Sequence, residues 1–198
     1  MNLQNLINPE LWLTVENNAV TLKEDNNTDN ETLRAVTIRD LPKNVFVFST
    51  DKPIEISTNK WKKRRNQFLN NENDKINKNC DAVIIHYDKN YLHIACCELK
   101  SKNPVPIQYE TQLINAQVLV DYLVALFNKF YKDEPKLQIK NVWYILFYMN
   151  RAIRIPKATR SEAQPVKEAM KNYSENIIKY KCSRTMFNNV KWKDLIND

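Results

Sequence analysis

Residues 80–100 read CDAVIIHYDKNYLHIACCELK, and this stretch decides the fold. Two apolar runs rich in β-forming residues, Ala82–Tyr87 and Tyr91–Leu99, lie on either side of the polar tripeptide Asp88-Lys89-Asn90. Runs of this kind that flank a short polar turn are typical of a β-hairpin. We therefore expect two antiparallel strands in the middle of the chain.

Charged residues mark both ends of this predicted hairpin. Asp81 precedes the first strand, and Glu98-Leu99-Lys100 ends the second. Alternate side chains of a strand share a face, so Glu98 and Lys100 should point the same way. A tight hairpin also brings the start of its first strand beside the end of its second. We therefore expect the Asp81 carboxylate to lie next to that of Glu98.

Two carboxylates held side by side indicate a site for a hard divalent cation. They repel each other unless a cation lies between them, and Mg²⁺ prefers oxygen ligands while keeping several waters. Such waters supply the nucleophile for phosphodiester hydrolysis. Lys100 would orient the attacking water or neutralise charge on the scissile phosphate. The alternative is a charge pair of Glu98 with Lys100 at a sheet edge, and an aspartate that starts a strand by chance.

The segments Cys80-Asp81-Ala82-Val83-Ile84-Ile85 and Cys97-Glu98-Leu99-Lys100-Ser101 resemble the core motif of the PD-(D/E)xK nuclease superfamily, which has the restriction-endonuclease-like fold. The resemblance covers about residues 81–149, in the order strand, strand, helix, strand. It departs from the motif at Cys80, a loosely held position where the motif has proline. The resemblance implies that Asp81, Glu98 and the backbone carbonyl of Leu99 bind Mg²⁺, or Mn²⁺ in its place. It implies that Lys100 is the catalytic lysine.

Further candidates lie around this core. Gln112 falls in the first turns of the next predicted helix, where several subgroups of the superfamily resemble one another in having a glutamine near the metal. The alternative for Gln112 is a solvated helix residue. Glu72 is the nearest match to an acidic residue that often completes such sites. His86 and His93 are not part of any recognisable set of metal ligands and are interpreted as structural. A basic cluster on a short predicted helix would bind phosphates, unless it is only a solvated face. This cluster comprises Lys60, Lys62, Lys63, Arg64 and Arg65.

Short β segments are expected over residues 1–50, before the central hairpin. Leu11–Val15 and Ala19–Leu22 flank Glu16-Asn17-Asn18 as a second hairpin, and Leu33–Ile38 and Val45–Phe48 follow as strands. Because the chain has no glycine, turns that need a positive φ must use asparagine or aspartate. The lack of glycine also excludes glycine-rich nucleotide-binding loops.

The second half of the chain alternates helix and strand. Apolar residues recur at helical spacing over Ile107–Tyr131, and Val142–Met149 is apolar enough for a strand buried on both faces. Pro165 suits the first turn of a final helix over residues 165–180. The sequence thus predicts a single α/β domain over residues 1–198, with its core at about 60–155. We expect a central mixed sheet flanked by helices, with extra N-terminal strands.

Composition bounds the function. The chain carries a formal net charge of +7, which is consistent with a polyanionic partner such as nucleic acid, and equally with a soluble protein that carries many surface lysines. The four cysteines form no CxxC pair, so a zinc site is not expected and a reducing cytoplasm fits best. No segment is typical of a signal peptide or of a membrane span.

These features predict a Mg²⁺-dependent nuclease that acts on DNA in preference to RNA. The resemblance suggests a restriction, phage-defence or mobile-element context, with a protein partner that supplies target recognition. The alternative is a catalytically silent subunit of the same fold that binds nucleic acid or protein.

Overall fold

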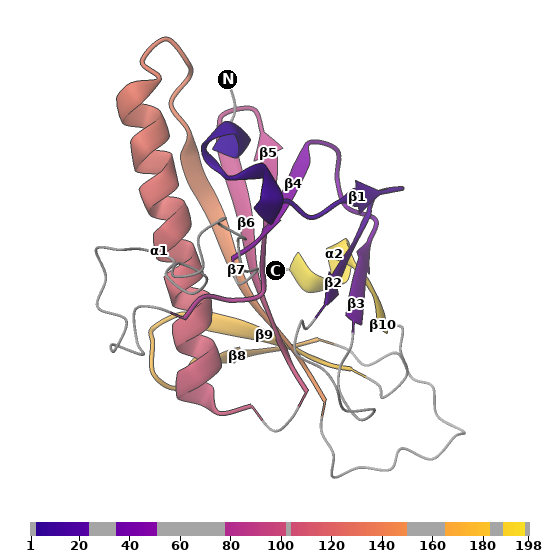
Figure 1. Cartoon of the computed structure of the whole chain (residues 1–198). Coiled ribbons are helices and arrows are strands. Elements are labelled where there is room, and N and C mark those ends of the chain that lie inside the picture. The colour runs from indigo at the N-terminus through magenta and orange to yellow at the C-terminus, as the bar shows by residue number, and fades with distance from the viewer. Residues whose placement is uncertain are drawn as a thin grey trace, which may run out of the picture.

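The computed structural model describes residues 3–23, 35–50, 78–101, 104–149, 165–182 and 188–196. Within these ranges the chain forms two β-sheets, two α-helices and two short 3₁₀ helices (Figure 1). The basic cluster at residues 60–65 and the weaker candidate Glu72 lie outside the described residues, as does the whole of the predicted helix over Lys60–Leu69.

A six-stranded mixed sheet forms the centre of the molecule, in the order β4-β5-β6-β7-β9-β8. Strands β6, β7 and β9 run parallel to one another, whereas β4-β5, β5-β6 and β8-β9 are antiparallel pairs. The strands are β4 (Val45–Ser49), β5 (Ala82–Asp88), β6 (Tyr91–Lys100), β7 (Gln138–Tyr148), β8 (Val166–Ala169) and β9 (Asn176–Lys181). The predicted central mixed sheet is thus confirmed.

The predicted central hairpin is confirmed as β5 and β6. Its register pairs Ala82 with Cys97 and Asp88 with Tyr91, which leaves a two-residue turn. Lys89 occupies this turn with φ 56°, a left-handed conformation for which glycine would be the easier residue. Tight closure of the hairpin fixes which residues meet at its other end, where Asp81 precedes β5.

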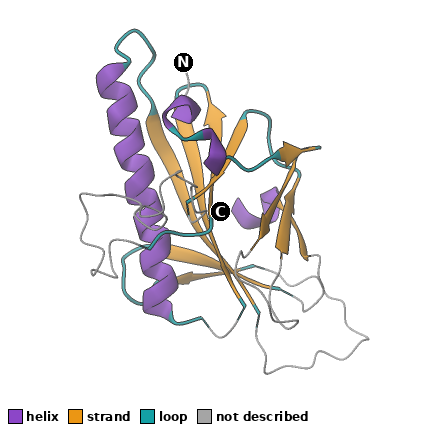
Figure 2. Ribbon diagram, viewed as in Figure 1, coloured by secondary structure: helices purple, strands orange, loops and turns teal. Residues whose placement is uncertain are grey.

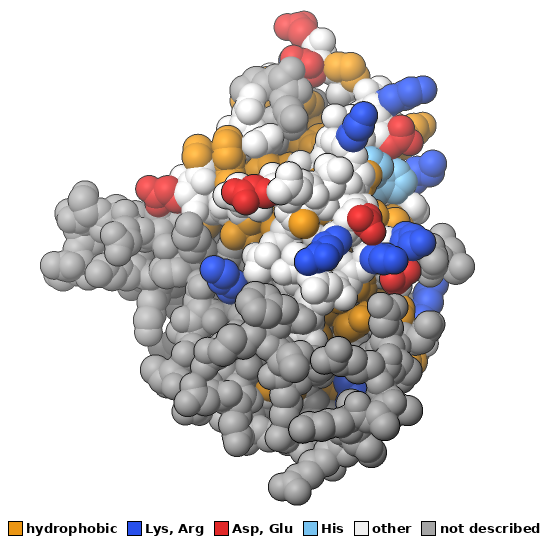
Figure 3. Space-filling model, turned by 90° about the vertical axis from the view of Figure 1, so that its right-hand side faces the viewer, with side chains coloured by type: hydrophobic (Ala, Val, Ile, Leu, Met, Phe, Trp, Pro, Cys, Tyr) orange, Lys and Arg blue, Asp and Glu red, His pale blue; other side chains and the backbone are white. Residues whose placement is uncertain are grey.

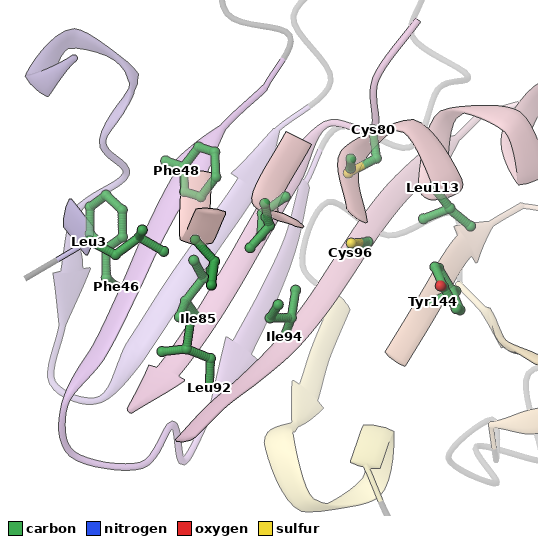
Figure 4. Packing of buried hydrophobic residues seen from close by; sticks show 14 of the residues in the cluster. Leu3, Phe46, Phe48, Cys80, Ile85, Leu92, Ile94, Cys96, Leu113 and Tyr144 are labelled. Atoms are coloured by element: carbon green, nitrogen blue, oxygen red, sulfur yellow. The ribbon is translucent and has the colours of Figure 1, made fainter. Parts of the chain in front are cut away.

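Helix α1 (Pro106–Phe130) covers one face of the sheet (Figure 2), as the apolar spacing predicted. Pro106 stands at its start, where a missing N–H is tolerated. Leu113 and Phe127 are among the residues that its inner face buries against β5, β6 and β7. Figure 4 shows Leu113 close to Tyr144 and the cysteines of this core. Helix α1 is also long and apolar enough to cross a membrane, but the core helix of a soluble protein can have the same length and composition.

A smaller sheet packs on the opposite face, in the order β1-β2-β3-β10. Its strands are β1 (Val15–Glu16), β2 (Ala19–Lys23), β3 (Ala35–Arg39) and β10 (Asn188–Lys191). Leu22 and Ile38 from this sheet share a buried cluster with Ile84 of β5 and Phe147 of β7. Asn17 and Asn18 adopt φ 50° and 57°, so asparagine fills the turn of the predicted N-terminal hairpin.

Two predicted elements are wrong in part or whole. Leu11–Val15 is not one strand. Leu11 ends a 3₁₀ helix, η2 (Pro9–Leu11), which Asn8 caps, and of the predicted strand only Val15 belongs to β1. Another 3₁₀ helix, η1 (Leu3–Leu6), precedes η2. The predicted helix over residues 165–180 is instead the β8–β9 hairpin. Ile177 and Ile178 are buried there because β9 pairs with the open edge of β7.

The C-terminal end of the described chain returns to the small sheet. Strand β10 pairs in parallel with β3, and α2 (Trp192–Ile196) follows it directly. Trp192 and Leu195 are buried in the core between the two sheets. The tail therefore closes this second core rather than extending from the domain.

Candidate metal centre

The carboxylates of Asp81 and Glu98 lie side by side at the end of the hairpin, as predicted. The Asp81 N–H donates to Glu98 Oε2 at 3.2 Å, and the Leu99 N–H donates to Asp81 Oδ2 at 2.6 Å. Each carboxylate is thus bound to the backbone of the opposite strand. Because these strands are central in the sheet, the pair has little freedom to separate.

Lys100 lies on the same face as Glu98, which the alternation of the strand predicted. Its ammonium contacts Glu98 Oε1 as an ion pair. The Lys100 side chain is 28% exposed, whereas that of Glu98 is 1% exposed. The lysine side chain therefore reaches from the buried carboxyl group of Glu98 toward solvent.

Burial raises the pKa of Glu98, the neighbouring Asp81 carboxylate adds to the rise, and Lys100 acts in the opposite direction, so that the pKa lies at about 8. Glu98 Oε1 is completely buried, and the ammonium of Lys100 is the cation that contacts it within the described chain. A buried carboxylate is costly unless cations or hydrogen bonds compensate its charge, and the pKa of Glu98 stays raised despite Lys100. The site therefore favours either a proton or a metal ion on Glu98.

In EDTA, the raised pKa of Glu98 should make folding stability fall as the pH rises. The unfolded chain loses this proton near 4.5 and the folded chain near 8, so the contribution of Glu98 to stability is greatest below about 4.5 and is lost progressively until about 8. Glu98→Gln removes this titration. In thermal unfolding at pH 9, the Tm of Glu98→Gln should be higher than that of the parent. At pH 5 this difference in Tm should be smaller or absent. An equal difference at both pH values would show that burial does not shift this carboxyl.

Asp81 and Glu98 offer carboxylate oxygens, which are the donors that a hard divalent cation prefers. Within the described residues, no third His, Cys, Asp or Glu side chain is placed to complete a metal site with them. Mg²⁺ is commonly held by one or two carboxylates, with water and substrate phosphates completing the shell. The Leu99 N–H is already bound to Asp81, and the role of its carbonyl as a ligand stays a prediction.

Gln112 lies on α1 beside the chain that leads into Asp81. Its side-chain Nε2 donates to the carbonyl of Asn79 at 3.1 Å, and Asn115 Nδ2 donates to the carbonyl of Lys78 at 2.7 Å. These bonds fix the segment before Asp81 against the helix. A positioning role is therefore what this geometry supports, and the predicted catalytic role of Gln112 stays a prediction.

The two histidines lie away from this centre, on the opposite face of the sheet. Their rings are 5.5 Å apart, and His93 also stacks on Trp143. His93 Nδ1 is hydrogen-bonded to the side chain of Asn141 at 3.1 Å. These contacts agree with the structural interpretation of both residues.

Asp81 also borders a cleft of about 800 Å³ that extends along the small sheet. Thr21, Thr37 and Arg39 contribute to its lining, together with Ser49 at the end of β4. Figure 3 shows basic and acidic side chains interspersed over the described part of the face that carries this sheet. The cleft gives access to Asp81 but does not form a continuous cationic surface.

Sequence reasoning missed two neighbours of Lys100 in the sheet. The register pairs Lys100 with Tyr148 of β7, and Tyr148 with Lys181 of β9. Tyr148 could have been found, because it lies near the end of the strand predicted over Val142–Met149. Lys181 could not, because the segment before it was predicted as a helix.

Comparison of the chain with protein-family models, with curated proteins and with solved structures finds no match.

Proposed function

We propose that this protein is a Mg²⁺-dependent nuclease of the PD-(D/E)xK type, with a restriction-endonuclease-like core, and that DNA is its preferred substrate. The observation that carries this proposal is the convergence of Asp81, Glu98 and Lys100 on one face at the end of β6. The order of β5, β6, α1 and β7 agrees with the strand, strand, helix, strand order of that superfamily. The net charge of +7 suits a nucleic-acid substrate.

Each residue has a distinct part in the proposed reaction. Asp81 and Glu98 hold the cation, which when bound would withdraw charge from the phosphate and activate water. The hydrogen bond from the Leu99 N–H keeps the Asp81 carboxylate turned toward Glu98. Lys100 would leave its ion pair with Glu98 and neutralise negative charge as it develops on the scissile phosphate.

We place this activity in the cytoplasm, in a restriction, phage-defence or mobile-element setting, with a protein partner that supplies target recognition. The basic residues 60–65 would contribute to nucleic-acid binding. A silent binding subunit could hold the same Glu98–Lys100 ion pair, so the activity itself must be measured.

The direct test is incubation with plasmid, linear and single-stranded DNA and with RNA, in Mg²⁺, Mn²⁺ or EDTA. We expect cleavage of DNA with either metal and none in EDTA. Asp81→Asn, prepared in parallel, should be inactive because the neutral amide weakens the metal site. Absence of cleavage on every substrate would contradict the proposal, as would equal cleavage by Asp81→Asn, which would reveal a contaminating nuclease.

A further inference from the structure

A row of side chains crosses the sheet next to the candidate metal centre. Lys100 pairs in register with Tyr148, and Tyr148 pairs with Lys181, so the row spans the carboxyl ends of β6, β7 and β9. Residues paired in this way lie on the same face of a sheet. Leu146 of β7 and Ile177 of β9 face the core beneath α1. Because alternate residues of a strand share a face, Tyr148 and Lys181 lie on this same face of the sheet. The row therefore lies on the face that carries Asp81 and Glu98.

The backbone of this row is rigid. The Met149 N–H donates to the carbonyl of Lys100 at 3.1 Å, and the Cys182 N–H donates to the carbonyl of Tyr148 at 2.8 Å. The sheet ladder therefore continues beyond the last residue of each strand. Binding groups on such a frame are placed more reproducibly than groups on loops.

The two lysines of β9 that share this face differ in their partners. Lys179 forms an ion pair with Glu168, and its ammonium lies 5.4 Å from the centre of the Tyr109 ring. Within the described chain, Lys181 forms no ion pair, and its side chain is only partly buried. Of the two, Lys181 is therefore the lysine with a charge available to an external anion.

The spacing of the row limits how many nucleotides can lie between its two lysines. Adjacent strands of a sheet are about 4.8 Å apart, so Lys100 and Lys181, two strands apart, are separated by about 10 Å. Phosphates of one strand in a duplex advance by about 3.4 Å per nucleotide along the axis and also wind around it, so they are farther apart than this rise. Two phosphates about 10 Å apart are therefore separated by at most about three nucleotides.

We propose that Lys181 binds a backbone phosphate within three nucleotides of the scissile phosphate, on the same strand, with Tyr148 lying beneath the intervening sugar or base. The inference rests on the proposed nuclease function and identifies how this site holds its substrate. It adds a phosphate contact outside the metal centre, made by a strand that the sequence motif does not reach.

The test measures binding separately from cleavage. Affinity for a labelled DNA oligonucleotide is measured by fluorescence anisotropy in EDTA and in Ca²⁺, over a range of salt. Lys181→Gln should weaken binding by about three- to tenfold and lower the slope of log K against log salt by about 0.7 to 0.9. Lys181→Arg should restore both. Lys140→Gln is the matched control, because Lys140 is an exposed sheet lysine at the opposite end of β7, over Tyr91.

A chemical substitution in the DNA locates the contact. Uncharged methylphosphonate groups are introduced one at a time within three nucleotides on either side of the cleavage position. One of them should weaken binding to the parent but not weaken binding to Lys181→Gln any further. The inference is overturned if Lys181→Gln matches Lys140→Gln in affinity and salt slope, or if the parent and Lys181→Gln respond alike to every methylphosphonate.

The two proposals fail in different ways. If the parent cleaves DNA and Lys181→Gln binds DNA as the parent does, the proposed phosphate contact is wrong and the proposed nuclease function is retained. If Lys181→Gln has a reduced salt slope but the parent cleaves no DNA, the nuclease function is wrong and the row is a nucleic-acid contact. The position of that contact is then found by placing the methylphosphonates along the whole oligonucleotide.

Discussion

Exchange of Glu98 for glutamine is expected to abolish cleavage and divalent-metal binding together. The substitution keeps the size of a side chain that is 1% exposed, so packing is retained. It removes the negative charge of the carboxyl group whose buried Oε1 contacts the ammonium of Lys100. We expect cleavage to fall by about 10³-fold or more and Mg²⁺ or Mn²⁺ affinity by more than about 100-fold. Calorimetric titration with Mn²⁺ and a plasmid-nicking assay measure the two effects.

Glu110 supplies a matched control for this experiment. It is equally buried, at 1% exposed, but lies on α1, where its carboxylate accepts hydrogen bonds from the backbone N–H groups of Lys171 and Asn172. Glu110→Gln should lower stability, since it weakens the anchor of the β8–β9 turn, and it should leave metal affinity unchanged. Retained metal binding in Glu98→Gln, or an equal loss in Glu110→Gln, would show that Asp81 and Glu98 do not form a metal site.

The closest agreement between sequence and structure lies in the hairpin and the site at its end. Strand alternation and a tight turn are local properties, so the proximity of Asp81 to Glu98 followed from residues 80–100 alone. The burial of Glu98 did not follow, because it depends on α1 and on strands from other parts of the chain. Its raised pKa is therefore a property that only the tertiary structure reveals.

The segment over residues 165–180 shows where local reasoning failed. Residues 166–171 read VKEAMK, and lysine, glutamate, alanine and methionine all favour a helix. The isoleucines 177 and 178 favour a strand, and burial against β7 decides in their favour. Glu110 then fixes the turn between β8 and β9 from another element altogether. Pairing of this kind is set by tertiary contacts, which no local pattern displays.

The pairing of β10 with β3 has the same origin. These strands are separated by about 150 residues of sequence, and β10 is only four residues long. A short strand that pairs so far from its own position gives no periodic signal of its own. The second, smaller sheet was therefore predicted only as a set of N-terminal strands, without its fourth member.

Replacement of Lys100 by methionine separates catalysis from metal binding. Methionine keeps an unbranched apolar stem of similar length and removes the ammonium that contacts Glu98. Cleavage should fall by about 10²- to 10³-fold, the usual effect of removing one group that stabilises charge in the transition state. Mn²⁺ affinity should be retained, because lysine is not a ligand and its positive charge competes with the cation for Glu98. A single-turnover cleavage assay and a Mn²⁺ titration measure these two quantities.

Stability should change little in Lys100→Met, although a buried carboxylate loses its partner. Removal of one member of a buried ion pair usually destabilises a protein by about 3–5 kcal/mol. Here the pKa of Glu98 is raised to about 8, so at pH 7 the carboxyl can take up a proton instead of remaining as an unpaired charge. Lys179→Met is the matched control, since Lys179 also pairs with a carboxylate and its side chain is 20% exposed. If Lys100→Met cleaves DNA at the parental rate while Glu98→Gln is inactive, the proposed metal site is retained. The neutralisation of charge on the phosphate then belongs to a residue other than Lys100.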